Sequence, residues 1–323
     1  MKKWIIIAVG LLLVLAWTFL YFVPQKVLSM ITEYEPYTFE SILPYDSMRV
    51  HYGIYDNDHP SNYGYDIVEE ISFSSGYDGK QLSGWYVASA PQSGQCVVLL
   101  HGRTSNRLKP MKYLELFKTT GLDTVYNFFI PDLRNSGRSE ASSTYMGYRF
   151  ADDIAASMKW LQENQKQDTV VLYGFSMGAM AIEILLGRGD LVDEVRQSYV
   201  SKVILDSPLS DVKGTLWRGA EDLGLPESLF DYYFQDFDAL VDGFGEEMAF
   251  GYLLSQNDRP TLIMASDTDK QTPFGLLTNE LSVVENPDHI QFHAFTGIPH
   301  VKLYQTDSTK DRYTKLVSEF LKE

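Results

Sequence analysis

One serine of this chain stands between two glycines in a setting that suits a nucleophile. Residues 174–178 read Gly-Phe-Ser-Met-Gly, with Ser176 at the centre. The residues before this segment have the composition of a buried strand, and those after it have the composition of a helix. A sharp turn between such elements exposes the serine hydroxyl and lets the Met177 amide point at a reacting carbonyl oxygen, whereas a serine that only capped the helix would not need both glycines. The segment predicts nucleophilic attack on an acyl group by Ser176.

A serine nucleophile needs a base, and the chain has 6 histidines that could supply it. His300 is the one that we expect in a loop, between the last predicted strand and the last predicted helix. An imidazole there can accept the Ser176 proton and return it to the leaving group. The others lie before the predicted core, or beside or within a predicted strand: His51, His59, His101, His289 and His293.

The elements that must position these groups are visible from residue 66 onward, where apolar strands alternate with amphipathic helices. This alternation predicts an α/β fold, with a mostly parallel central sheet and helices on both faces. In such folds the catalytic groups collect at the carboxyl ends of the strands. We expect strands at 67–73, 82–88, 96–100, 125–130, 170–173, 203–205, 261–265 and 291–295, and helices at 112–119, 153–162, 177–186, 274–281 and 312–321.

Four further segments occur in an order typical of a known family. His101 and Gly102 follow one predicted strand, residues 132–139 read Asp-Leu-Arg-Asn-Ser-Gly-Arg-Ser after the next, and residues 267–273 and 297–300 follow two later ones. With the serine segment, they make residues 66–322 resemble the α/β-hydrolase superfamily, and within it the serine aminopeptidase-like group, which includes membrane-anchored bacterial members. The resemblance implies an α/β-hydrolase fold at 66–323, with a helical cap insert at about 211–256.

The resemblance also indicates the acid of a Ser-His-Asp triad. Asp269 looks like the family's acid, since it follows a predicted strand and stands four residues before Pro273. Asp267 and Asp206 are the alternatives. With the serine and the histidine above, Asp269 completes the order Ser, Asp, His that this fold uses.

The loop after the predicted strand 96–100 corresponds to the family's oxyanion-binding loop. The resemblance implies that the backbone amides of Arg103 and Met177 bind the developing oxyanion. Position 103 is commonly aromatic or glycine in relatives, so the Arg103 side chain either binds a substrate carboxylate or lies in solvent. We expect the His101 side chain to pack the loop, and the segment 132–139 to support a second loop without taking part in the chemistry.

The insert at 211–256 bears on the substrate. It carries ten acidic and two basic residues, so a polyanion such as an acyl-coenzyme A would approach an unfavourable field. A neutral or cationic acyl substrate, either a small molecule or a peptide, fits better. In relatives that cleave N-terminal residues, cap carboxylates hold the free amine, and Glu221, Asp222 or Glu227 could do so here. We expect no cofactor and no metal; the single cysteine, Cys96, excludes a thiolate metal cluster.

The first 26 residues indicate a membrane anchor. Residues 4–23 carry no charge and would span about 30 Å as a helix, the thickness of a bilayer core. Lys2 and Lys3 precede this stretch, which predicts a single-pass protein of the cell membrane, with its N-terminus in the cytoplasm and its catalytic domain outside. A cleaved signal peptide is the alternative, but the apolar run is long for one. Residues 27–65 are expected to form a tether with an edge that packs on the domain.

Charge and composition exclude other classes of function. With a net charge of −16 and an isoelectric point near 4.8, the chain lacks the basic surface that nucleic-acid binding requires. We therefore predict a membrane-anchored extracytoplasmic serine hydrolase that cleaves a carboxylic ester or a related acyl bond. The alternative is a catalytically silent binding or scaffold protein on the same fold.

Overall fold

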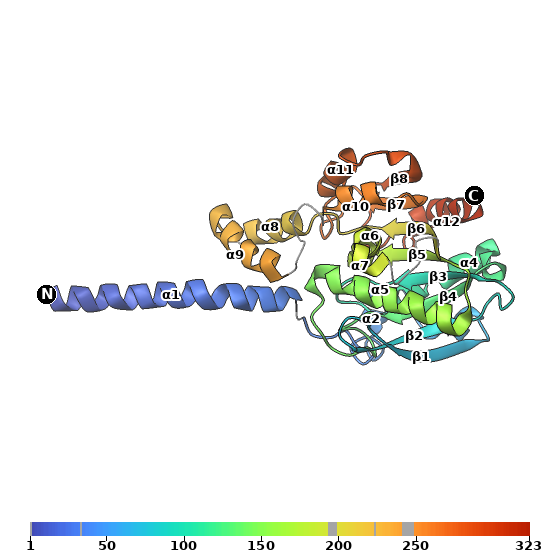
Figure 1. Ribbon diagram of the computed structural model, residues 1–323, viewed down its shortest axis with the longest axis horizontal. Helices are drawn as coiled ribbons and strands as arrows, with labels where there is room; N and C mark the ends of the chain where they lie inside the picture. Colours follow the sequence, from blue (N-terminus) through green and yellow to red (C-terminus); the bar gives the residue numbers. More distant parts are fainter. Residues whose placement is uncertain (1, 33, 193–198, 223, 241–248) are drawn as a thin grey trace.

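Eight strands form one mixed sheet at the centre of the computed structural model, which describes residues 2–32, 34–192, 199–222, 224–240 and 249–323 (Figure 1). The strand order is β1-β2-β4-β3-β5-β6-β7-β8; β1 and β2 are antiparallel to their neighbours, and β3 to β8 run parallel. The predicted α/β fold with a mostly parallel sheet is thus confirmed. The strands are β1 Val68–Ser74, β2 Gln81–Val87, β3 Gln95–Leu100, β4 Asn127–Asp132, β5 Thr169–Phe175, β6 Val200–Asp206, β7 Thr261–Ser266 and β8 Ile290–Phe295.

Helices cover both faces of the sheet because the strands are apolar on both sides. In β3, Cys96, Val98 and Leu100 face one core cluster, and Val97 and Leu99 face the other. The first cluster lies under α5 Tyr148–Trp160, α6 Met177–Gly187, α10 Phe250–Gln256 and α11 Phe274–Ser282. The second lies under α3 Leu108–Met111, α4 Leu114–Thr120 and α12 Asp307–Lys322. The helix expected at 112–119 corresponds to α4, and the short helix α3 precedes it.

The chain before β1 contains a long exposed helix and a packed segment. Helix α1, Lys2–Thr32, projects from the rest of the molecule (Figure 1). It includes a window of 20 residues, Lys3–Phe22, with a mean hydropathy of 2.6, long and apolar enough to cross a membrane. The segment that follows, with α2 Asp46–Tyr52 and the 3-10 helix η1 Pro60–Tyr63, packs on the second face of the sheet through Phe39, Ile42, Tyr52, Ile54 and Tyr65.

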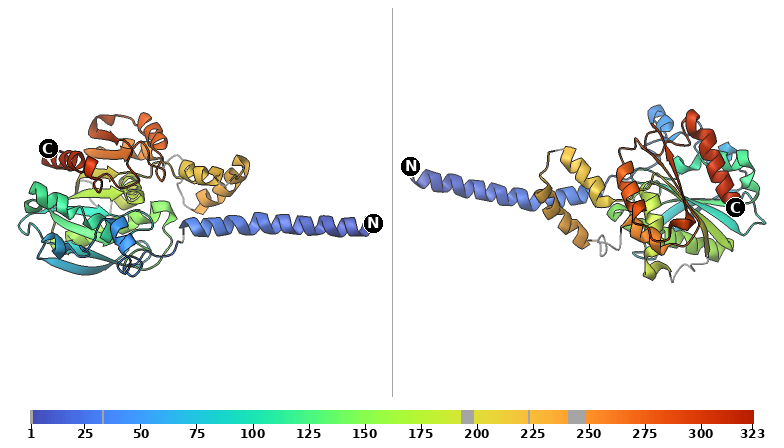
Figure 2. Two further views of the ribbon diagram at one scale, coloured as in Figure 1. Left: turned by 180° about the vertical axis from the view of Figure 1, so that it is seen from behind. Right: turned by 90° about the horizontal axis from the view of Figure 1, so that it is seen from above.

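The insert between β6 and β7 divides into two parts. Helices α8 Val212–Asp222 and α9 Glu227–Leu240 project beyond the sheet on the same side as α1, and α9 contacts α1 (Figures 1 and 2). Phe230 joins them, with its ring centroid 5.2 Å from that of Trp217. Helix α10 instead packs against α6 and α11 and buries Phe250 in the core. The projecting cap is thus shorter than the insert expected at 211–256, and residues 223 and 241–248 lie outside the described part.

Candidate active site

Ser176 lies in a sharp turn between β5 and α6. Its backbone has φ 55° and ψ −120°, a conformation that is costly for a residue with a side chain. The two flanking glycines are needed because other backbone lies very close. A Cβ at Gly174 would lie 2.7 Å from the Cα of Ala179, and one at Gly178 would lie 2.4 Å from the His101 carbonyl oxygen. The turn is therefore held by tight packing that only glycine allows, and it places Ser176 at the carboxyl end of β5.

His300 and Asp269 meet at the carboxyl ends of the neighbouring strands. Asp269 follows β7 and His300 follows β8, and His300 Nδ1 donates a hydrogen bond of 2.7 Å to Asp269 Oδ2. Both side chains are well covered, with exposures of 1% for Asp269 and 7% for His300. Burial acts to raise the pKa of Asp269, but the hydrogen bond and charge of His300 and the donors of Thr272 hold this pKa below its usual value. Asp269 is therefore a carboxylate that orients the imidazole.

Thr272 completes the support of this pair, and the sequence analysis missed it. Its hydroxyl donates to Asp269 Oδ2 at 3.0 Å and lies 3.3 Å from His300 Nδ1. The amides of Gln271 and Thr272 donate to Asp269 Oδ1 at 2.9 and 3.1 Å. An aspartate followed three residues later by threonine commonly closes such a turn, so the spacing Asp269-x-x-Thr272 was the available signal.

The two alternative acids are bound elsewhere. Asp267 is exposed, and its Oδ1 accepts the Gly297 amide at 2.9 Å. Asp206 is fully buried at the end of β6, where Oδ2 accepts the hydroxyls of Tyr313 at 2.8 Å and Tyr113 at 3.2 Å, and Oδ1 accepts that of Ser207 at 2.9 Å. Neither carboxylate forms a hydrogen bond with the imidazole in the described part of the chain, so Asp269 is the acid in contact with it.

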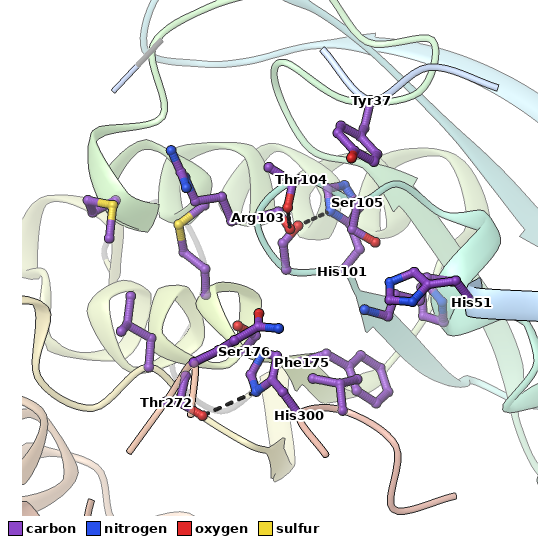
Figure 3. A pocket seen from close by; sticks show the side chains of 18 of the residues that line it. Tyr37, His51, His101, Arg103, Thr104, Ser105, Phe175, Ser176, Thr272 and His300 are labelled. Carbon is purple, nitrogen blue, oxygen red and sulfur yellow. Dashed lines mark hydrogen bonds between the residues drawn. The ribbon is translucent and has the colours of Figure 1, made fainter. Parts of the chain in front are cut away.

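Ser176 and His300 line the same cavity, which has a volume of about 520 Å³ (Figure 3). Among the described residues, the Ser176 hydroxyl makes no hydrogen bond with His300. In unliganded enzymes this contact is often long and tightens when substrate binds. The cavity thus brings together a strained serine and a histidine whose other nitrogen is bound to a carboxylate, which is an arrangement suited to acyl transfer.

The loop after β3 also reaches this cavity. The His101 ring is buried, and its Nε2 accepts the Leu133 amide at 2.9 Å, while Nδ1 lies 2.8 Å from the Gly102 carbonyl oxygen. Burial lowers the pKa of His101 to about 4, so the ring is neutral and carries its proton on Nδ1. As expected, the His101 ring packs within the loop, which it joins to Leu133 through these contacts.

Arg103 and Met177, the two residues expected to bind the oxyanion, line the cavity. Met177 begins α6, so its amide belongs to the first turn, where helix N–H groups have no partner within the helix. The Arg103 side chain does not lie in solvent, which was one of its two expected positions. Its guanidinium stacks over the Tyr34 ring at 4.6 Å, and burial lowers its pKa. Contact with a residue so distant in the chain leaves no trace in the sequence.

The segment 132–139 supports the site from behind. Asp132 is fully buried, and its carboxylate accepts the amides of Arg107 at 2.8 Å and Arg138 at 2.9 Å. It also forms an ion pair of 3.3 Å with the Arg107 side chain, which is buried between the rings of Phe39 and Trp85. Asp132 thus binds the segment that follows Arg103 and the one that ends at Ser139.

Comparisons with known proteins agree with this architecture. The sequence model of the family described as "alpha/beta hydrolase fold" matches residues 95–320. YqkD of Bacillus subtilis (strain 168), a protein described as uncharacterized, is 27% identical over 279 residues, which is 82% of this chain and 84% of YqkD.

Two esterases of known structure are also similar. The Pyrococcus furiosus esterase Pf2001 is 23% identical and superposes with a TM-score of 0.62, over 82% of this chain and 93% of the esterase. An esterase from Exiguobacterium antarcticum is 20% identical, with a TM-score of 0.51, over 78% of this chain and 99% of that esterase. At these identities the two structures show a shared fold.

Proposed function

Because the chain belongs to the α/β-hydrolase fold family, we propose that it is a serine hydrolase that cleaves carboxylic esters through an acyl-enzyme. One observation carries the proposal. The strained Ser176 follows β5 and lines one cavity together with His300, which follows β8. His300 is hydrogen-bonded to the buried Asp269, which follows β7. The esterase names of the two structural relatives above favour esters over peptides, so the aminopeptidase-like assignment is second to esterase.

The proposed reaction uses each group in turn. Ser176 Oγ attacks the ester carbonyl carbon, and His300 Nε2 takes the serine proton because Nδ1–H is already donated to Asp269. The amides of Arg103 and Met177 stabilise the oxyanion, each contributing about 3–4 kcal/mol by precedent. His300 then protonates the leaving alcohol, and an acyl group remains on Ser176. Water, activated by the same imidazole, releases the acid and restores the serine.

The test uses the full chain in detergent. A fluorophosphonate probe should label Ser176, as located by peptide mass spectrometry, and p-nitrophenyl butyrate should be hydrolysed with saturation kinetics. Ser176→Ala should remove both signals, whereas Ser142→Ala, a change at a residue that lies outside the catalytic cavity, should keep them. If the wild-type protein shows neither labelling nor hydrolysis, the hydrolase assignment is wrong and a binding or scaffold protein is favoured.

The proposal includes the location. We place the protein in the cell membrane as a single-pass protein, with the N-terminus in the cytoplasm and the hydrolase domain outside. The supporting features are the apolar window Lys3–Phe22, the preceding Lys2, and an aromatic group at the far end, where the Trp17 and Tyr21 rings stack at 5.5 Å. Protease added to intact cells should digest the domain. A protected domain would contradict this topology, and a mature protein that lacks the first residues would indicate a cleaved signal peptide.

The insert between β6 and β7 bears on the proposed substrate. The acidic residues of the insert favour a neutral or cationic group on the part of the substrate that lies toward α8 and α9. Thr215 and Leu216 of α8 line the cavity, so this helix contributes to the substrate site. No step of the reaction proposed above requires a cofactor or a metal ion.

A further inference from the structure

The charge inside the cavity differs from the charge of the whole protein. The net charge is −16, yet none of the described residues that line the cavity is an aspartate or a glutamate. The lining includes two cationic residues, Arg103 and Lys109, together with His51; Figure 3 labels Arg103 and His51. A cavity with low-dielectric walls concentrates the field of such groups on whatever it contains.

The Lys109 ammonium is a charged group of this lining for which the described residues supply no hydrogen-bond or ion-pair partner. It lies on α3, directly after the oxyanion-binding loop, and its Nζ lies 5.9 Å from the centroid of the Tyr52 ring. Within the described part of the chain, its ammonium makes no hydrogen bond and no ion pair. A partly buried ammonium can donate three hydrogen bonds, so this position is well suited to receive an anion.

Two further lysines, Lys112 and Lys302, act on Lys109, and their Nζ atoms bind neutral groups. Lys112 Nζ donates to the Tyr52 carbonyl oxygen at 3.1 Å and to Gln305 Oε1 at 3.3 Å. Lys302 Nζ donates to the same Gln305 oxygen at 2.7 Å and to the His51 carbonyl oxygen. All of these acceptors are neutral. Burial lowers the pKa of Lys112 well below its usual value, so that the positive charge beside Lys109 comes from Lys302.

The pKa values of Lys109 and His51 agree with this geometry. Burial, and next the charge of Lys302, lowers the pKa of Lys109 to about 8, so that it is still an ammonium at pH 7. Burial and the three lysines lower the pKa of His51 to about 4, which keeps this ring neutral. The charge of Asp206 partly offsets the lowering of the Lys109 pKa. Lys109 therefore places a positive charge on the cavity wall at neutral pH.

We infer that the cavity binds an ester that carries one carboxylate, and that this carboxylate pairs with the Lys109 ammonium while Ser176 attacks the ester carbonyl. This inference rests on the proposed function. The acidic insert led us to expect a neutral or cationic substrate. The present inference differs because the acidic residues lie on α8 and α9, whereas Lys109 lies on α3. The acidic helices α8 and α9 oppose polyanions on the outer side, whereas Lys109 attracts a single carboxylate inside.

Two pairs of chromogenic or chromatographically resolved esters test the inference at pH 7 with the full chain in detergent. The first pair places the charge on the acyl part: mono-p-nitrophenyl glutarate against p-nitrophenyl valerate. The second places it on the alcohol part: 4-carboxyphenyl butyrate against 4-carbamoylphenyl butyrate. In at least one pair, kcat/KM should be about tenfold higher for the anionic ester. The pair that shows this preference identifies the half of the substrate that faces Lys109.

Three variants connect the preference to the residue. Lys109→Met should reduce the anionic-to-neutral ratio of kcat/KM about tenfold, and Lys109→Glu should reduce it further. Lys315→Met is the matched control, since its side chain on α12 is 72% exposed and it changes the net charge equally; its ratio should equal that of the wild type. A wild-type ratio near one in both pairs, or a ratio that Lys109→Met leaves unchanged, would overturn the inference.

A binding measurement separates this inference from the hydrolase assignment. In Ser176→Ala, isothermal titration should show tighter binding of 4-phenylbutanoate than of the neutral 4-phenylbutanamide, and Lys109→Met added to this background should remove the difference. If the wild type hydrolyses no ester but this difference is present, the proposed function is wrong and the carboxylate site stands. Equal binding of the acid and the amide would contradict the carboxylate site, whatever the catalytic result.

Discussion

Replacing Asp269 with asparagine removes a charge and leaves the shape of the side chain almost unchanged. The two carboxylate oxygens have different surroundings, which decides how an amide would fit. One oxygen accepts two backbone N–H groups, from Gln271 and Thr272, and an NH₂ group placed there would face donors. The NH₂ group must therefore face His300 Nδ1 at the position of Oδ2. There it donates to Nδ1, and the imidazole proton moves to Nε2.

The size of the effect follows from this change of tautomer. With a proton on Nε2, His300 cannot accept the proton of Ser176, and the loss of the carboxylate also removes the charge that stabilises the imidazolium. We expect kcat to fall about 10⁴-fold, which is about 5.5 kcal/mol in activation free energy. Initial rates with p-nitrophenyl butyrate and the rate of fluorophosphonate labelling should fall together. Thermal unfolding should change little, because the remaining carbonyl oxygen still accepts both backbone amides.

Two matched variants make this prediction specific. Asp267→Asn changes an exposed carboxylate that accepts only the Gly297 amide, and we expect its kcat to stay within about threefold of the wild type. Asp206→Asn tests the buried alternative at the end of β6. If Asp269→Asn retained activity within tenfold while either control variant lost it, the assignment of the acid, and the tautomer argument with it, would be refuted.

Three further predictions concern one tightly packed glycine and two buried carboxyl groups. Gly178→Ala places a Cβ against the His101 carbonyl oxygen, so we expect a loss of about 1–3 kcal/mol in unfolding free energy and a lower kcat, measured by urea unfolding and ester hydrolysis. Asp132→Ala leaves the fully buried Arg107 without its buried carboxylate and should cost about 3–5 kcal/mol in the same unfolding assay. Burial raises the pKa of Glu183 from 4.5 to about 8. The folded carboxyl thus keeps a proton that the unfolded chain releases, and stability falls as pH rises through that window. Glu183→Gln should remove this fall, so that its unfolding free energy exceeds that of the wild type by a few kcal/mol at pH 8 and by much less at pH 5; parallel curves would contradict the assigned cause.

The strands were predictable because their apolar runs are short, rich in β-branched residues and bounded by turn residues. Strand β5 was expected at 170–173 and spans Thr169–Phe175, and β7 was expected at 261–265 and spans Thr261–Ser266. The serine turn was predictable from local spacing, since its glycines are required by contacts within the turn and with β3. Asp269 was indicated only through the family resemblance, because several aspartates follow strands.

Other features could not be read from the chain because they depend on contacts between distant segments. Lys302 donates to the carbonyl oxygen of His51, 251 positions away, and Lys112 donates to that of Tyr52. The helix expected at 112–119 begins two residues later, at Leu114, and the separate short helix α3 before it was not expected. Hydrophobic periodicity reports which residues are buried, but it does not fix the residue at which a helix begins.

The protein is acidic, but the described residues that line its cavity include no aspartate or glutamate. This contrast leads to a mechanism that selects substrates by charge in two stages. At long range, the net charge of −16 repels multiply charged anions, and this effect weakens as salt screens it over about 10 Å. At short range, the Lys109 ammonium lies among neutral acceptors and other lysines, where screening is weaker and a single carboxylate can form a charge-assisted hydrogen bond. The first stage discriminates by total charge and the second by the position of one charge. A small monoanionic ester satisfies both stages, whereas a polyanion is opposed by the first and a neutral ester gains nothing from the second.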